Sequence, residues 1–195
     1  MTEIEWFASD DVLQILGGLR QAYIDDEVGL RRLLHEYYLA CCVAIWKLLP
    51  QEKSRRAVEV AEQYVAGRAT RDELGKAAYD AEGAAFNIQY EGDCEAIARW
   101  IEETRSIPDA DLRAIIHPLE AVSGISTREL LRRAAYFAEF AVSRPDPWAD
   151  PHDEYVPFLS AEILRQVAGN PFHSERQSSK RPASEKRAPK PWLGS

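Results

Sequence analysis

The stretch YYLACCVAIWKLLP, residues 37–50, indicates the fold class, because ten unbroken apolar residues run from Tyr37 to Trp46. Roughly 20 apolar residues are needed for a helix to cross a bilayer, so this run is too short to be a membrane span. Apolar residues upstream recur at spacings of three and four, which predicts a helix over residues 26–49 that ends before Pro50. A helix that is apolar on every side is surrounded by protein, so we expect this one at the buried centre of a helical domain.

The adjacent residues Cys41 and Cys42 in this run introduce the alternative of a metal or redox site. Neighbouring residues on a helix point about 100° apart, so the two thiols diverge, and a disulfide between them would distort the backbone. His35 shares a face with Cys42, but two helical turns separate them by roughly 10 Å, too far for both to bind one ion unaided. We interpret both cysteines as core packing. A metal site that joins His35 and Cys42 to residues from elsewhere in the fold stays open as the alternative.

Charge is distributed unevenly along the chain of 195 residues, whose formal net charge is −8. Residues 173–195 hold six of the 24 Lys and Arg residues and two of the 32 acids, a net charge of +4. The preceding 172 residues therefore hold 18 basic and 30 acidic side chains, a net charge of −12. An acidic body repels phosphate backbones, so we expect nucleic acid to be contacted only through the basic tail. The tail is rich in Ser, Pro, Lys and Arg, a composition that predicts disorder.

The N-terminal sequence and the cysteines bear on the compartment. MTEIEWFASDD is acidic and lacks the basic and apolar segments of a secretory signal peptide. The chain has three cysteines, an odd number, which favours reduced thiols over a disulfide framework. We therefore expect a cytoplasmic protein that does not associate with a membrane.

Helical periodicity continues through most of the remaining chain, with no alternating strand pattern and no Asn-Gly or Asp-Gly hairpin signal. Capping residues predict where helices begin: Ser9-Asp10-Asp11 is typical of a cap with an acidic first turn, while Thr70 and Ser126 each stand three residues before a glutamate. Besides the central helix, we expect one helix that begins at Ser9-Asp10-Asp11 and others over residues 51–66, 70–90, 93–104, 109–116, 126–142 and 159–168. The sequence thus predicts an all-α domain over residues 1–172, an irregular bundle of about seven to eight helices around a buried central helix.

Several motifs of this chain occur together in a fixed order. They are Met-Thr-Glu-x-Glu-Trp at the start, a cysteine-rich segment that leads into Ile45-Trp46, SRRAVEVAE at residues 54–62, and GNPF at residues 169–172. In these segments the chain resembles an all-helical family that is present in many copies in planctomycete-type bacteria. The resemblance covers residues 1–75 and 159–172, and it implies a helical domain but no particular activity. The family usually has basic residues where this chain has Val43-Ala44, so a site built on them is not expected here.

The segment SRPDPWADPHDEYVPF, residues 143–158, is predicted to be a loop because it holds four prolines. Its candidate metal ligands are Asp146, Asp150, His152 and Asp153, since hard divalent cations prefer oxygen ligands. The spacing does not fit an EF-hand, which needs glycine at the sixth loop position and glutamate at the twelfth. We interpret the segment as a solvated acidic loop, with a divalent cation site as the alternative.

Aromatic residues outside the predicted core supply the candidate contact residues. They are Trp6, Trp148 and Phe172, because aromatic side chains are enriched in protein interfaces; Trp192 in the tail is a further exposed tryptophan. Phe172 also has a structural explanation, in which Gly169 ends a helix and Phe172 returns to the core.

The sequence lacks the common catalytic patterns: it has no Gly-x-Ser-x-Gly, no His-Glu-x-x-His, no phosphate-binding glycine loop and no Cys-x-x-Cys. We therefore expect a non-enzymatic protein-interaction module with an acidic surface, a basic protein partner and no cofactor. The alternative is a metal-assisted enzyme that uses the loop at residues 146–154, or His35 and Cys42 with residues from elsewhere.

Overall fold

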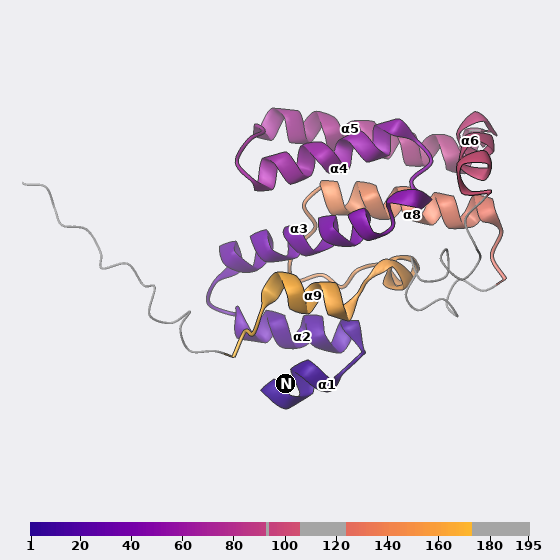
Figure 1. The fold of residues 1–195 in the computed structure, drawn as a ribbon. Helices are drawn as coiled ribbons and strands as arrows, with labels where there is room; N and C mark the ends of the chain where they lie inside the picture. Colours follow the sequence, from indigo (N-terminus) through magenta and orange to yellow (C-terminus); the bar gives the residue numbers. More distant parts are fainter. Residues whose placement is uncertain (93, 106–123, 173–195) are drawn as a thin grey trace, which may run out of the picture.

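The computed structural model describes residues 1–92, 94–105 and 124–172, and within these ranges the chain is all-α (Figure 1). This confirms the predicted fold class. The α-helices are α1 (Glu3–Ala8), α2 (Val12–Ala22), α3 (Glu27–Ala44), α4 (Glu52–Val65), α5 (Arg71–Phe86), α6 (Cys94–Thr104), α8 (Thr127–Val142) and α9 (Ala161–Ala168). Shorter turns are η1 (Trp46–Leu48), the π-helical η2 (Asn87–Glu91) and η4 (Asp153–Phe158). The helix expected over 109–116, the basic tail at 173–195 and Trp192 lie outside the described residues.

The helices stack in layers on both sides of α3, which packs against α4, α8 and α9. In Figure 1, α4 and α5 form a pair joined by a short loop on one side of the bundle, while α2 and α9 lie on the other side, with α1 outermost. The helix α5 contacts both α4 and α8. The structure therefore confirms an irregular bundle with α3 as its central helix.

The central helix α3 is buried along most of its length, as the apolar run predicts. Both tyrosines and both cysteines of the run are buried, together with Leu30, Leu33, Leu34, His35 and Leu39. The helix is shorter than predicted, because it ends at Ala44 and η1 follows before Pro50. Val43 is exposed, so the C-terminal end of α3 is not enclosed on every side. Within the described residues no helix, α3 included, is long and apolar enough to cross a membrane.

The short helix α1 is one that the periodicity did not predict. Its signal is a Thr-x-x-Glu pattern, since Thr2 and Glu5 form a complete capping box. Trp6 of α1 is fully buried, so the expectation that it is exposed for contacts is wrong. Its ring lies edge-on to Phe172, with centroids 6.3 Å apart. This contact and a hydrogen bond from Arg165 of α9 to the Trp6 carbonyl at 2.9 Å hold α1 against α9 and the residues that follow it.

The predicted caps at Thr70 and Ser126 form, the second only in part, and within the predicted segment Ser9-Asp10-Asp11 it is Asp11 that caps α2, so its acids do not lie in the first turn. Asp11 accepts hydrogen bonds from two N–H groups of the first turn of α2, and Thr70 with Glu73 makes a complete capping box at α5. At α8 the Ser126 hydroxyl accepts from the N–H of Glu129 at 3.2 Å, as predicted. The Glu129 carboxylate does not return the bond, because it binds two arginines of its own helix instead. Hydrogen bonds from these two arginines also hold the pKa of Glu129 down at about 2.

Candidate functional site

The acidic loop between α8 and α9 uses its carboxylates to fix its own shape. Asp150 forms an ion pair with Arg20 of α2, and the same guanidinium donates a hydrogen bond to the carbonyl of Pro147 at 2.8 Å. Asp146 accepts a hydrogen bond from the backbone N–H of Trp148 at 2.9 Å. The loop is therefore attached to α2 by charged contacts, which differs from the freely solvated loop that the sequence analysis favoured.

The remaining candidate metal ligands of this loop lie in or beside η4. His152 caps this turn through Nδ1, which accepts from the N–H of Glu154 at 3.2 Å. The Glu154 carboxylate pairs with Arg132 of α8 at 2.9 Å, and Asp153 lies in the first turn of η4. In the part of the chain that the structure describes, no three His, Cys, Asp or Glu side chains gather as a metal ion would require. The structure does not bring the four candidate ligands together.

The two cysteines of α3 lie fully buried in the core. Burial raises the pKa of Cys41 to about 12 and that of Cys42 well above its ordinary value. Metal binding and nucleophilic attack both require the thiolate, which these environments disfavour. The position of both thiols agrees with the interpretation that they are small apolar groups of the core.

His35 belongs to α3, two turns before Cys42. It is buried near the end of α8. Its ring lies 6.3 Å from that of Tyr64 in α4, and its Nε2 has no hydrogen-bond partner within the described part of the chain. Burial, with a smaller contribution from the positive charge of Arg144, lowers the pKa of His35 to about 4. The imidazole is therefore neutral at pH 7.

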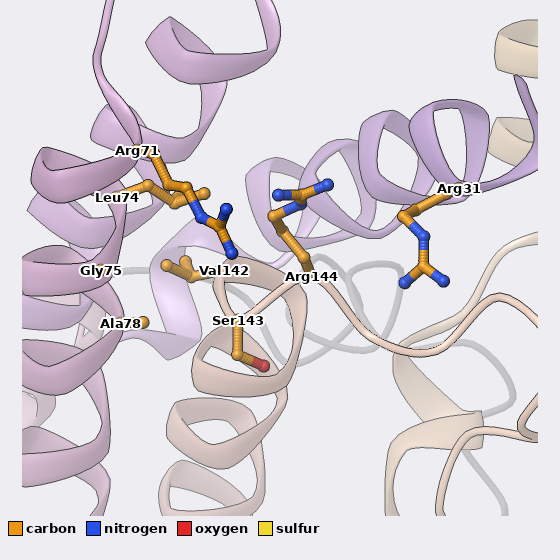
Figure 2. A pocket seen from close by; sticks show the side chains of 8 residues that line it. All are labelled: Arg31, Arg71, Leu74, Gly75, Ala78, Val142, Ser143 and Arg144. Atoms are coloured by element: carbon orange, nitrogen blue, oxygen red, sulfur yellow. The ribbon is translucent and has the colours of Figure 1, made fainter. Parts of the chain in front are cut away.

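A cavity of about 420 Å³ opens between α3, α5 and the end of α8. Three arginines line it, one from each of these regions: Arg31, Arg71 and Arg144. Figure 2 shows the side chains of Arg71 and Arg144 reaching into the space between α5 and the end of α8, with Arg31 on the neighbouring helix. We call this cavity the arginine pocket. Its remaining wall consists of small and apolar groups, Leu74, Gly75, Ala78, Val142 and Ser143.

The three arginines differ in how their charge is compensated. Arg31 forms an ion pair with Glu27 of its own helix at 2.8 Å. Arg144 donates a hydrogen bond to the Tyr64 hydroxyl at 3.2 Å and lies over that ring, 5.5 Å from its centroid. Arg71 makes no ion pair or hydrogen bond with any described residue. Two of the three guanidinium charges in the pocket therefore lack a carboxylate partner within the described ranges.

The backbone of Arg144 is in the left-handed region, with a φ of 61°. It is the second residue after α8, where glycine or asparagine usually ends a helix in this conformation. Arg144 is the one non-glycine residue with positive φ among those that the structure describes. Such a conformation disfavours a side chain, and strained residues of this kind gather at functional sites.

A second surface feature lies on the outward side of α5 and η2. Tyr79, Phe86 and Tyr90 follow one another at spacings of seven and four, so they share a face. Their exposed fractions are 75%, 49% and 64%, and the rings of Phe86 and Tyr90 lie 4.3 Å apart. We call these three residues the aromatic strip. Gly83 lies between them, and a side chain added there would meet nothing within 4 Å.

The other two candidate contact residues lie apart from both features. Trp148 is 41% exposed in the loop attached to α2. Phe172 is half-buried and packs on Trp6, which agrees with its explanation as a residue that returns to the core. Of the three predicted contact residues, Trp148 alone is exposed.

Sequence reasoning missed both the arginine pocket and the aromatic strip. The strip could have been found in the sequence, because its three aromatic residues follow helical spacing. The alanines of the same helix lie on the opposite side, which identifies the alanine side as the buried one. The pocket had no such signal, since its arginines come from positions 31, 71 and 144 and meet only in the folded chain.

Comparisons of the chain with protein-family models, with curated proteins and with solved structures found no match. The resemblance to the planctomycete-type family therefore rests on the sequence motifs alone, and the function has to be inferred from the chain's own surfaces.

Proposed function

We propose that the protein is a non-enzymatic interaction module of the cytoplasm and that the aromatic strip is its binding surface. The observation that carries the proposal is the exposure of Tyr79, Phe86 and Tyr90 on one helix face. Aromatic side chains bury large areas in interfaces and dominate their energetics, whereas a lone exposed aromatic residue needs no explanation. Tyr79 lies two helical turns before Phe86, and Phe86 lies one turn before Tyr90, so the three rings line one exposed face of α5 and η2.

The partner that fits this surface is a protein segment that carries apolar side chains together with Lys or Arg. Asp72 and Glu82 lie on the same helix face as the strip, by their spacing from Tyr79, with Lys76 as the single basic residue among them. Cations of the partner can therefore pair with carboxylates and also lie over exposed aromatic rings. The net charge of −8 attracts such a partner over longer distances.

Gly83 supports the same proposal. An exposed glycine inside a helix costs about 1 kcal/mol relative to alanine, so it weakens α5 without any packing benefit from within the chain. Its position between Tyr79 and Phe86, with open space beyond it, lets the backbone of a partner approach the helix closely. A glycine at this position is useful only if another molecule binds to the aromatic strip.

The test is site-specific photo-crosslinking in cells of the source organism, with the crosslinker placed at Phe86 and, as a matched control, at Val28. Val28 is an equally apolar exposed residue on α3, at 82% exposure. We expect one protein to be captured from Phe86 and not from Val28. After purification, this protein should lose at least about tenfold in affinity when Phe86 and Tyr90 are both replaced by alanine, since interface aromatics are typical hot spots.

Three outcomes would contradict the proposal. They are the same capture at both positions, binding that the double alanine variant leaves unchanged, and binding that survives removal of every Lys and Arg from the captured segment. Capture of a second copy of this chain would show that the strip is a self-association surface.

A further inference from the structure

The arginine pocket concentrates positive charge on an acidic protein. The first 172 residues have a net charge of −12, yet three guanidinium groups line one cavity. Glu27 compensates Arg31, which leaves the charges of Arg71 and Arg144 without a carboxylate partner among the described residues. Guanidinium groups that are brought together repel one another, so the arrangement favours an anion with about two negative charges.

The helix dipoles around the pocket do not determine whether it prefers an anion or a cation. Arg71 is the first residue of α5, where helix dipoles favour anions, and Val142 is the last residue of α8, where they disfavour them. These two contributions oppose each other across the same cavity. The arginine side chains therefore set the sign of the ligand charge.

Arg144 adopts a backbone conformation that is unfavourable for an arginine. Its φ of 61° suits glycine or asparagine, while an arginine side chain there is strained. The contact with Tyr64 fixes the direction of its guanidinium, which Figure 2 shows directed into the pocket. A strained residue whose charged group is aimed into a cavity is what a preorganised anion site requires.

The opposite wall of the pocket indicates what the anion is attached to. Leu74, Ala78 and Val142 present apolar groups, and Gly75 leaves the surface of α5 open, with nothing within 4 Å of an added side chain. A volume of about 420 Å³ is within the usual range for small-molecule sites and exceeds the need of a bare inorganic ion. The ligand thus has an apolar or neutral organic part beside its charged group.

We propose that the arginine pocket binds the phosphate monoester of a small organic molecule. A phosphate monoester has a charge of −1.5 to −2 near pH 7, which matches the two uncompensated arginines. Its tetrahedral oxygens can accept hydrogen bonds from guanidinium groups that approach from α5 and from the end of α8 at once. The residues that line the pocket do not include any of the aromatic strip, so the two proposals are tested by different variants.

The test is isothermal titration calorimetry with phenyl phosphate on the full chain, at low ionic strength and pH 7.5. We expect saturable binding that weakens at least about tenfold in Arg71→Gln and in Arg144→Asn, because each removes charge-assisted hydrogen bonds. Arg56→Gln is the matched control, since Arg56 is an exposed arginine of α4 that does not line the pocket. Raising the salt concentration should also weaken binding.

The choice of variants separates binding from folding. Asparagine suits the backbone of position 144 better than arginine does, and position 71 is exposed in the first turn of α5, so both variants should melt cooperatively like the parent protein. No saturable binding of phenyl phosphate by the parent protein would overturn the proposal, as would an equal loss in Arg56→Gln. Succinate binding more tightly than phenyl phosphate would overturn the phosphate assignment. Phe86→Ala should leave phenyl phosphate binding unchanged.

Discussion

The helices α3 and α5 are of similar length, 18 and 16 residues, but they are built in opposite ways. In α3 the large side chains point inward, and the helix is covered by α4, α8 and α9. In α5 the inward side consists mainly of alanines that pack against α4 and α8, while the large aromatic side chains point outward. The first arrangement stabilises the fold. The second leaves one helix face and one end for contacts with other molecules, which is why both proposals involve α5.

The largest expected effect comes from deleting one large side chain on each helix. Leu34→Ala on α3 should lower the free energy of unfolding by about 2–5 kcal/mol, because Leu34 is buried and its removal leaves a cavity. Phe86→Ala on α5 should change it by no more than about 0.5 kcal/mol, since the ring is half exposed and alanine favours the helix. Urea unfolding followed by circular dichroism measures both. Equal losses of unfolding free energy in the two variants would show that the large side chains of α3 and α5 do not differ in their contribution to the fold.

The second prediction concerns how the stability of the protein depends on pH, and it again distinguishes a residue of α3 from one of α5. His35 of α3 has a folded pKa of about 4, against an ordinary value of 6.5, chiefly because it is buried. The unfolded chain therefore binds more protons between these values, so the stability that this group contributes is complete above pH 6.5 and is lost as the pH falls to 4. The shift corresponds to about 3 kcal/mol.

The measurement is the unfolding free energy at several pH values between 4 and 8, for the parent protein, His35→Phe and Phe86→Ala. We expect the difference between His35→Phe and the parent to change across this range, since phenylalanine does not titrate. Phe86→Ala on α5 should follow the parent at every pH. The depressed pKa of Glu129, about 2, affects all three proteins equally and at lower pH. A constant difference between His35→Phe and the parent would contradict the assignment.

The two helices also show how far the sequence could predict the fold. Most of α3 was predictable, because an unbroken apolar run allows a helix only one environment, the protein interior. Its end was not, because Val43 is apolar and nevertheless exposed. The end of the helix depends on how η1 and Pro50 turn the chain, which is a property of the fold. Cap patterns predicted helix starts well, and at Ser126 the reciprocal bond failed only because arginines were better partners for Glu129.

The candidate sites were less predictable than the helices. Trp6 was expected to be exposed, since a single tryptophan near the terminus gives no periodicity that would reveal the buried side of α1. The arginine pocket joins residues that are 40 and 73 positions apart along the chain, from Arg31 to Arg71 and from Arg71 to Arg144. Local patterns carry no information about such distant pairs. Tertiary packing of α3, α5 and α8 creates this site, so it could be recognised only in the structure.

The smallest expected effect tests why α5 has two exposed glycines, Gly75 and Gly83. Replacing either by alanine should raise the free energy of unfolding by about 0.5–1 kcal/mol, since alanine is the better helix former and a new Cβ meets nothing within 4 Å at either position. Thermal melts of the two variants measure this gain. A loss of stability in either one would show that its glycine serves the packing of the bundle.

The two glycines should differ in binding, because only Gly75 lines the arginine pocket. The methyl group of Gly75→Ala projects from the apolar wall and reduces the space in the pocket, so this variant should bind phenyl phosphate more weakly. Gly83→Ala should bind it as the parent protein does. For the crosslinked partner we expect the opposite result, with weaker binding in Gly83→Ala and unchanged binding in Gly75→Ala. Gly83 lies between the residues of the aromatic strip, and a methyl group there keeps a partner's backbone away from the helix. If both variants became more stable and lost neither ligand, the glycines would have no role in contacts. Stability gained together with the matching loss of one ligand would show that each end of α5 retains glycine for binding, at the expense of helix stability.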